Sequence, residues 1–154
     1  MSEEPVDFAA KVPEAYERIK GDIRRTPVER SEALSRELGA DVYIKWECDQ
    51  TTGSFKLRGA LNKLRSLSEA EKRRGVVSAS TGNHGLAISH ASRLEGVKLK
   101  LFLPETVAAV KKARIMAMGI DVEVQGASCD KAERLARQFA ARQGRTHRQT
   151  TRHW

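Results

Sequence analysis

Residues 53–60 read Gly-Ser-Phe-Lys-Leu-Arg-Gly-Ala, and residues 80–85 read Ser-Thr-Gly-Asn-His-Gly. Lys56, in the first segment, stands at the start of an expected apolar helix and two positions after Ser54. A lysine in such a setting can form an imine with an aldehyde. The second segment follows an expected strand and opens the next helix, where backbone N–H groups bind anions. Together the two segments indicate a covalently held aldehyde cofactor beside a carboxylate-binding loop.

Strands and helices alternate around these segments. Residues 56–67 carry apolar side chains at helical spacing, and strands are expected over residues 75–79, 97–103 and 121–125. The helices expected after these three strands cover residues 84–94, 106–118 and 129–141. Short links between alternating strands and helices are typical of a parallel sheet covered by helices. The sequence therefore predicts an α/β fold, a parallel sheet flanked by helices.

The N-terminal part is predicted to be mainly helical. A helix expected over residues 8–23 ends at Arg25-Thr26-Pro27, because the residue before a proline is disfavoured in helices. Ser31 is an expected N-cap for a second helix over residues 32–38. A strand is then expected over residues 42–47, where β-branched and aromatic residues alternate with polar ones.

The charge of the chain is unevenly distributed. The 154 residues include 28 bases and 20 acids, for a formal net charge of +8. Residues 141–154 contain four arginines and no acid, so half of the net charge lies in this tail. The remainder mixes both signs and shows no nucleic-acid-binding motif, so we expect no nucleic-acid partner.

No apolar run reaches the ~20 residues of a membrane span, and the acidic N-terminus does not resemble a signal peptide. Cys48 and Cys129 match neither a metal-ligand nor a redox spacing. His84 and His90 add no ligand geometry to them, so no metal site is expected. These features predict a cytoplasmic protein with reduced thiols and no membrane partner.

The two segments also carry a family resemblance. From about residue 23 to residue 138 the chain resembles the N-terminal part of the threonine/serine dehydratase group of tryptophan-synthase-β-like, or fold type II, pyridoxal-phosphate enzymes. The motifs Ser-Phe-Lys-x-Arg-Gly-Ala and Ser-x-Gly-Asn-His-Gly stand in the order and spacing of that family. The resemblance implies pyridoxal 5'-phosphate as cofactor and a small amino-acid substrate. It also implies a homo-oligomer for full-length members.

The resemblance assigns roles to individual residues. Lys56 would hold the cofactor as a Schiff base and move the Cα proton of the substrate. Phe55 would pack beneath the cofactor ring, and Asn83 would hydrogen-bond its 3′-hydroxyl. The loop for the substrate carboxylate would comprise Ser80, Thr81, Gly82, Asn83 and His84. Taken alone, Lys56 fits a surface lysine and the loop fits an ordinary βα turn; the presence of both motifs favours the functional interpretation.

Two neighbours of Lys56 have more than one interpretation. Ser54 either caps the helix or contacts the cofactor phosphate, and the sequence leaves both open. Arg58 could be a phosphate ligand, but the family pattern favours a structural role.

Two loop residues bear on the reaction. Racemase-type members carry serine at position 81, whereas threonine dehydratases often carry alanine. Thr81 keeps a hydroxyl but is bulkier than serine, which favours elimination over racemisation. His84 points to the ammonia-lyase branch, because members that transfer sulfur groups or make threonine usually carry threonine there. The expected reaction is β-elimination of a hydroxy amino acid to a 2-oxo acid and ammonia. The sequence does not distinguish threonine from serine or hydroxyaspartate.

The family's phosphate cradle is a run of consecutive glycines, and no two of the 11 glycines here are adjacent. We therefore expect a truncated enzyme in which the large domain is mostly missing. Residues 1–41 would be an N-terminal helical segment of that domain, residues 42–141 the small α/β domain, and residues 142–154 an irregular basic tail. A frameshift or premature stop would explain the tail.

The alternative to an ammonia-lyase is a catalytically inactive, folded remnant that lacks the phosphate-binding half. A nucleotide-binding module is a third hypothesis. It is disfavoured because Gly82-Asn83-His84-Gly85 matches neither a dinucleotide fingerprint nor a P-loop.

Overall fold

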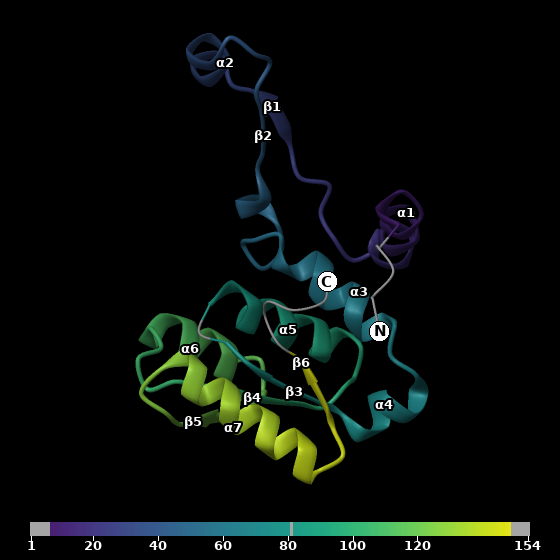
Figure 1. The fold of residues 1–154 in the computed structure, drawn as a ribbon, viewed down its shortest axis with the longest axis vertical. Helices are drawn as coiled ribbons and strands as arrows, with labels where there is room; N and C mark the ends of the chain where they lie inside the picture. Colours follow the sequence, from purple (N-terminus) through teal and green to yellow (C-terminus); the bar gives the residue numbers. More distant parts are fainter. Residues whose placement is uncertain (1–6, 81, 149–154) are drawn as a thin grey trace.

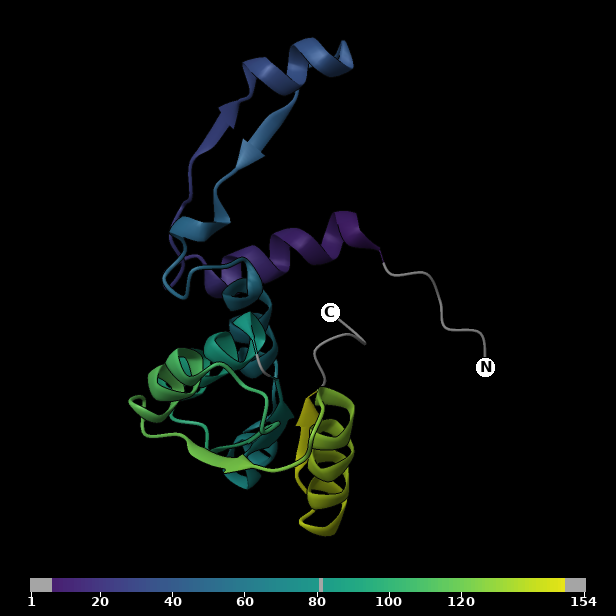
Figure 2. The ribbon, with the colours of Figure 1, turned by 90° about the vertical axis from the view of Figure 1, so that its left-hand side faces the viewer.

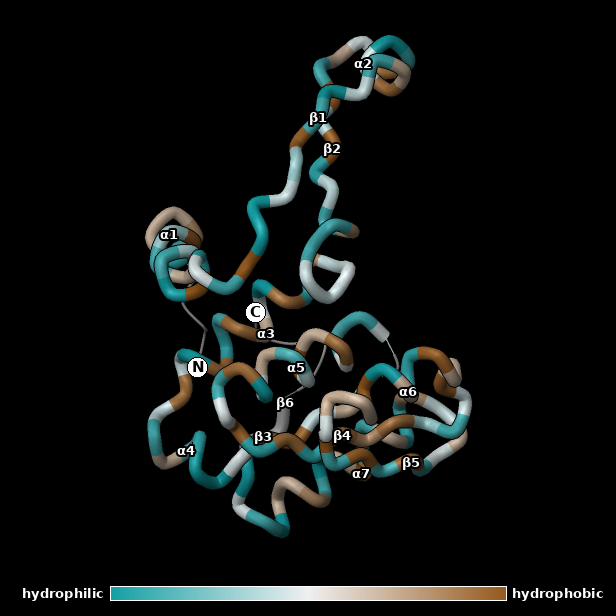
Figure 3. The backbone as a smooth tube through the Cα atoms, turned by 180° about the vertical axis from the view of Figure 1, so that it is seen from behind, coloured by the Kyte–Doolittle hydropathy of each residue, from teal (hydrophilic) through white to brown (hydrophobic). Residues whose placement is uncertain are grey.

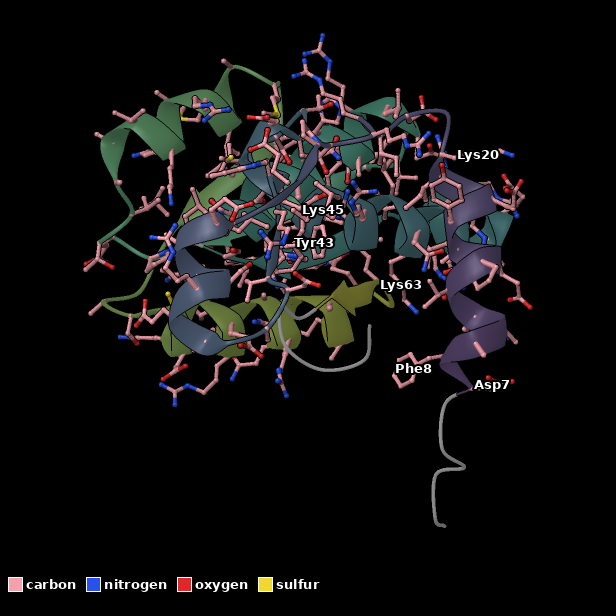
Figure 4. The ribbon with its side chains drawn as sticks, turned by 90° about the horizontal axis from the view of Figure 1, so that it is seen from above. Asp7, Phe8, Lys20, Tyr43, Lys45 and Lys63 are labelled. Atoms are coloured by element: carbon pink, nitrogen blue, oxygen red, sulfur yellow. The ribbon has the colours of Figure 1, made fainter. Side chains whose placement is uncertain are left out.

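A computed structural model describes residues 7–80 and 82–148. An N-terminal helix and a projecting hairpin adjoin an α/β body (Figure 1). The first helix, α1 (Phe8–Ile19), begins at Asp7, whose carboxylate accepts hydrogen bonds from the N–H groups of Ala9 and Ala10. It ends one turn before the predicted end at residue 23. Seen from above, Phe8 and Lys20 mark the two ends of α1 (Figure 4).

The hairpin consists of β1 (Val28–Arg30) and β2 (Tyr43–Lys45), which pair antiparallel. Helix α2 (Glu32–Leu38) lies at its far end. Ser31 caps α2 as predicted, since its side chain accepts a hydrogen bond from the N–H of Leu34. The expected boundary between residues 41 and 42 falls inside this hairpin. The strand expected over residues 42–47 is present as β2, which pairs with β1 and not with the parallel sheet.

The 3₁₀-helix η1 (Glu47–Asp49) leads from the hairpin toward α3 (Lys56–Arg65). The predicted apolar face of α3 is confirmed, because Leu57, Ala60, Leu61 and Leu64 are buried. Arg65, at the end of α3, donates hydrogen bonds to Asp22, Glu95 and the carbonyl of Arg18. These bonds tie the ends of α1 and α5 to α3. Helix α4 (Glu69–Arg74) follows and begins with a capping box.

The body contains a four-stranded parallel sheet, in the order β5-β4-β3-β6. Its strands are β3 (Val76–Ala79), β4 (Leu99–Leu103), β5 (Asp121–Val124) and β6 (Thr146–Arg148). Its helices are α5 (Asn83–Leu94), α6 (Ala109–Met116) and α7 (Cys129–Arg142). The predicted α/β fold, a parallel sheet flanked by helices, is therefore confirmed.

Both faces of the sheet are covered, and alternate strand residues serve opposite faces. Val76 packs with α3, α5 and α6, whereas its neighbour Val77 packs against α7. Figure 2 shows α7 on one side of the sheet and α5 with α6 on the other. Hydrophobic residues line β3 and β4 accordingly (Figure 3). Since crossovers are right-handed, helices change face where the strand order reverses, which here is between β3 and β6.

Strand β6 corrects the expectation of an irregular tail from residue 142 onward. Residues 146–148 pair in parallel with residues 76–78 of β3. The pairing uses backbone groups and so does not require apolar side chains. Helix α7 carries the chain back along the sheet, and Gly144, with φ of 57°, turns it into β6. The expectation for residues 149–154 lies outside the described residues.

Within residues 7–80 and 82–148, no helix combines the length and apolar character that crossing a membrane requires. The same residues contain no group of three or more His, Cys, Asp or Glu side chains arranged to hold a metal ion.

Candidate active site at the end of β3

The topology of the sheet singles out the end of β3. In open parallel sheets, ligands bind beyond the carboxyl ends of the strands where the strand order reverses. Here the chain proceeds from β3 to β4 and β5, and then returns to place β6 on the other side of β3. The loop that starts at Ser80 follows β3 directly. The topology therefore selects the same loop as the sequence motif, on independent grounds.

Ser80 shapes this loop. Its Oγ accepts hydrogen bonds from the N–H of Gly82 at 3.3 Å and of Gly85 at 3.1 Å. Gly82 is the N-cap of α5 and has no side chain that could accept a hydrogen bond. The side chain of Ser80 caps the helix instead. Gly85 permits the close approach, because a Cβ there would lie 2.9 Å from the carbonyl oxygen of Ser80. Thr81 lies outside the described residues.

Lys56 and Phe55 stand at the start of α3. The Nζ of Lys56 lies 4.7 Å from the centroid of the Phe55 ring. A hollow of about 320 Å³ is lined by Phe55, Lys56, Arg58 and Gly59. The Phe55 side chain is not part of the core, since the residue is 58% exposed. Its ring is therefore accessible for stacking against a planar ligand.

His84 connects the two motifs. The residue is only 4% exposed, and its Nε2 lies 3.3 Å from Oγ of Ser78, a buried residue of β3. Burial and, to a smaller extent, the positive charge of Lys56 together lower the pKa of His84 from 6.5 to about 4. The imidazole is therefore neutral at pH 7. Helix α3, which begins at Lys56, packs against α5, which carries His84 in its first turn.

Arg58 has the structural role that the family pattern favours. Its Nη2 and Nε donate to the two carboxylate oxygens of Glu47, at 2.7 and 3.0 Å. Gln50 accepts a hydrogen bond from the N–H of Arg24 at 2.9 Å and donates one to its carbonyl at 3.0 Å. We call Glu47, Gln50 and Arg58 the brace, because they fix the chain between the hairpin and α3. Hydrogen bonds from Arg58 and Thr26 hold the pKa of Glu47 below its usual value.

The residues around Lys56 fit the aldehyde and ring of the expected cofactor. They offer an amine, an open aromatic ring and a hydroxyl. The Oγ of Ser54 is buried and has no hydrogen-bond partner among the described residues, so an oxygen of a ligand would satisfy it. Asn83 is exposed in the first turn of α5. The roles of Phe55 and Asn83 stay predictions.

The hydrogen-bond partners of these residues were not expected from the sequence. Ser78 is a polar residue within the apolar strand Val-Val-Ser-Ala, and that irregularity was a usable signal. Glu47 and Gln50 gave no such signal, because their partners lie eleven and twenty-six residues away.

Comparisons with known proteins identify the family of the chain. The family described as pyridoxal-phosphate dependent enzymes matches residues 19–153, and the chain belongs to this family. A serine racemase from Bos taurus is 41% identical over 134 residues, which are 85% of this chain and 40% of that protein. An L-threonine ammonia-lyase from Thermotoga maritima is 35% identical over 133 residues, covering 86% of this chain and 33% of that protein.

A solved structure shows the same architecture. The crystal structure of a serine racemase from Dictyostelium discoideum superposes with a TM-score of 0.81 at 36% identity, over 91% of this chain and 46% of the other. The chain thus spans 33% to 40% of these two curated relatives. Pyridoxal phosphate is the cofactor of the family to which it belongs.

Proposed function

We propose that this chain is the part of a pyridoxal-phosphate-dependent ammonia-lyase that carries the cofactor lysine and the substrate carboxylate loop. Its substrate class would be β-hydroxy amino acids such as threonine or serine, converted to a 2-oxo acid and ammonia. The observation that supports the proposal is the packing of α3, which begins at Lys56, against α5, which follows the loop at the end of β3.

Each residue of the proposed site has a separate role. When bound, the cofactor supplies an electron sink for the carbanion at Cα. Lys56 holds the cofactor and transfers the Cα proton, and Phe55 supports one face of the ring. The loop from Ser80 to His84 binds the substrate carboxylate through backbone N–H groups at the N-terminus of α5, where the helix dipole favours an anion.

Elimination is preferred to racemisation because of Thr81. A racemase needs a second proton donor on the face opposite Lys56. The threonine hydroxyl is attached to a bulkier, β-branched side chain than that of serine, and β-branched side chains have restricted rotamers. The preference follows from the residue type at position 81 alone. Replacing Thr81 with Ser is expected to raise any racemase side activity.

The second candidate is a folded remnant without catalytic function. Two observations favour it. Apolar clusters cover both faces of the sheet within this chain, so the chain can fold. The sequence contains no run of glycines that could hold the cofactor phosphate. Loss of even two charge-assisted hydrogen bonds to phosphate, each worth roughly 1.5–3 kcal/mol, would weaken cofactor binding more than about a hundredfold. We therefore expect no sustained turnover from the 154 residues alone.

The assignment of Lys56 is tested by chemical trapping. The chain, alone and fused to the C-terminal part of a related enzyme, is incubated with pyridoxal phosphate, reduced with borohydride and analysed by peptide mass spectrometry. We expect the adduct on Lys56, and its loss in Lys56→Ala. Lys63→Ala, on the same helix, should keep it. An adduct that survives Lys56→Ala at another lysine would overturn the assignment.

The reaction is tested in the same fusion. L-Threonine and L-serine are supplied, and 2-oxo acid and D-serine are measured separately. Release of 2-oxo acid supports the ammonia-lyase. D-serine as the main product would show a racemase instead. Sustained turnover by the chain alone, dependent on Lys56, would exclude the remnant.

A further inference from the structure

His84 lies at the junction of three elements. It occupies the first turn of α5, its Nε2 meets Oγ of Ser78 in β3, and Lys56 at the start of α3 acts on it electrostatically. A buried imidazole loses its contacts with water, and burial is tolerated only with hydrogen bonds in return. Such a residue in a well-packed helix calls for a physical reason.

A charged imidazole would be unfavourable at this place. The N-terminus of α5 is the positive end of the helix dipole, and Lys56 adds a second positive charge. His84 therefore serves as a neutral hydrogen-bonding group. A carboxylate bound at the loop would contact the N-terminus of α5, whose first turn contains the neutral ring of His84.

Two hydroxyl groups of the same strand end hold this turn. Ser78 and Ser80 are two residues apart, so their side chains lie on the same face of β3. Ser80 binds the loop backbone through the N–H groups of Gly82 and Gly85, and Ser78 binds the ring of His84. The first turn of α5 is thus attached to β3 twice, once by its backbone and once by a side chain.

We propose that His84 is a positioning residue that, through Ser78, fixes the first turn of α5 against β3, so that the N–H groups of the loop keep the orientation that a substrate carboxylate requires. The inference rests on the proposed function for the carboxylate. The attachment of the turn can be measured without any ligand. Ser78 then has a functional role that the motif does not include.

The first test measures amide exchange at the loop in the full 154-residue chain. Ser78→Ala and His84→Leu should each speed exchange of the Gly85 N–H about tenfold, as expected for the loss of roughly one hydrogen bond of stabilisation. Ser78→Thr and His84→Gln, which keep a hydroxyl and a side-chain nitrogen, should restore the wild-type rate. Ser92→Ala removes a buried hydroxyl at the other end of α5 and is the matched control.

The second test measures the tautomer of the His84 imidazole. Imidazole ¹⁵N shifts should report one dominant tautomer for His84 in the wild-type chain and in Ser78→Thr, and a mixture in Ser78→Ala. A purely structural contribution of Ser78 to stability would leave the tautomer unchanged. Unchanged Gly85 exchange or an unchanged tautomer in Ser78→Ala would overturn the role of His84.

A third measurement separates the inference from the proposed function. The chain is titrated with L-threonine and with L-threoninamide, which lacks the carboxylate, and backbone amide shifts are followed. Shifts of Gly82, Asn83 and Gly85 with threonine alone support the carboxylate site, and Ser78→Ala should weaken them several-fold. The absence of such shifts in the wild type would count against the proposed function, whereas equal affinity in Ser78→Ala would count against His84.

Discussion

The buried imidazole of His84 couples the stability of the chain to pH. Its pKa is about 4 in the folded chain, against an ordinary 6.5. Between these values the unfolded chain binds more protons than the folded one. The stabilisation is therefore complete above pH 6.5 and is lost as the pH falls toward 4, by up to about 3 kcal/mol.

Urea unfolding at pH 7 and pH 4.5 measures this effect. We expect His84→Gln to lose less stability between the two pH values than the wild type, because glutamine does not titrate. His90→Gln, on the same helix, should keep the wild-type difference. Equal pH dependence in His84→Gln and the wild type would refute the assignment.

Glu47 is the central residue of the brace. Its carboxylate accepts hydrogen bonds from Arg58 and, at 2.6 Å, from Thr26. Glu47→Gln leaves the partly buried guanidinium without its charged partner, and we expect a loss of roughly 1–3 kcal/mol in the free energy of unfolding. Glu37→Gln, at an exposed position of α2, should change it by less than about 0.5 kcal/mol. A change as small in Glu47→Gln would show that the brace is not stabilising.

For single residues, the sequence predicts candidate catalytic groups better than it predicts their hydrogen-bond partners. Lys56 and the loop could be associated because both motifs are local and stand in a fixed order. The partners Ser78, Glu47 and Gln50 could not be assigned, since a hydrogen bond across many residues depends on the fold. The exposure of Phe55 likewise follows from the position of α3 and not from its residue type.

Among the elements, the β3–α5 turn depends on the absence of a side chain at Gly85. A Cβ there would press on the backbone carbonyl of Ser80, which cannot yield as a flexible side chain would. We expect Gly85→Ala to destabilise the chain by about 1–3 kcal/mol and to speed exchange in the loop. Gly21 has open space and no positive φ, so Gly21→Ala is the control and should be near neutral. Similar unfolding curves for the two variants would contradict the tight packing.

The pairing of β6 with β3 can be tested by hydrogen exchange. Hydrogen exchange should be slow at those amides of residues 146–148 that face β3, in contrast to an irregular tail. A chain ending at residue 144 would expose the edge of β3, and we expect it to unfold at lower urea concentration. Rapid exchange throughout residues 146–148 would show that β6 does not form and that the tail is irregular.

The elements that were predicted correctly are those with local signals. The cap at Ser31 and the apolar face of α3 each involve residues within one or two turns. Strands β1 and β6 were missed because three residues carry little periodicity, and both exist through pairing with a distant strand. The same reason explains why the pairing of β2 with β1 could not be predicted from the sequence.

The whole molecule exposes an apolar stripe along α1. Phe8, Val12 and Tyr16 are four residues apart and largely exposed, with Phe8 at 66%. Full burial of such a side chain contributes roughly 1.5–3 kcal/mol. We expect the chain to self-associate with rising concentration, and Phe8→Ser to weaken that association about tenfold or more in sedimentation velocity. Val110→Ser, at an isolated exposed position on α6, is the control. A monomer at all concentrations would refute the expectation.

The brace also gives the projecting hairpin a mechanical property. Glu47 and Gln50 follow β2 directly, and Arg58 lies on the same helix as Lys56, two residues further along. The hydrogen bonds between Glu47 and Arg58 therefore couple the base of the hairpin mechanically to the helix that begins at Lys56.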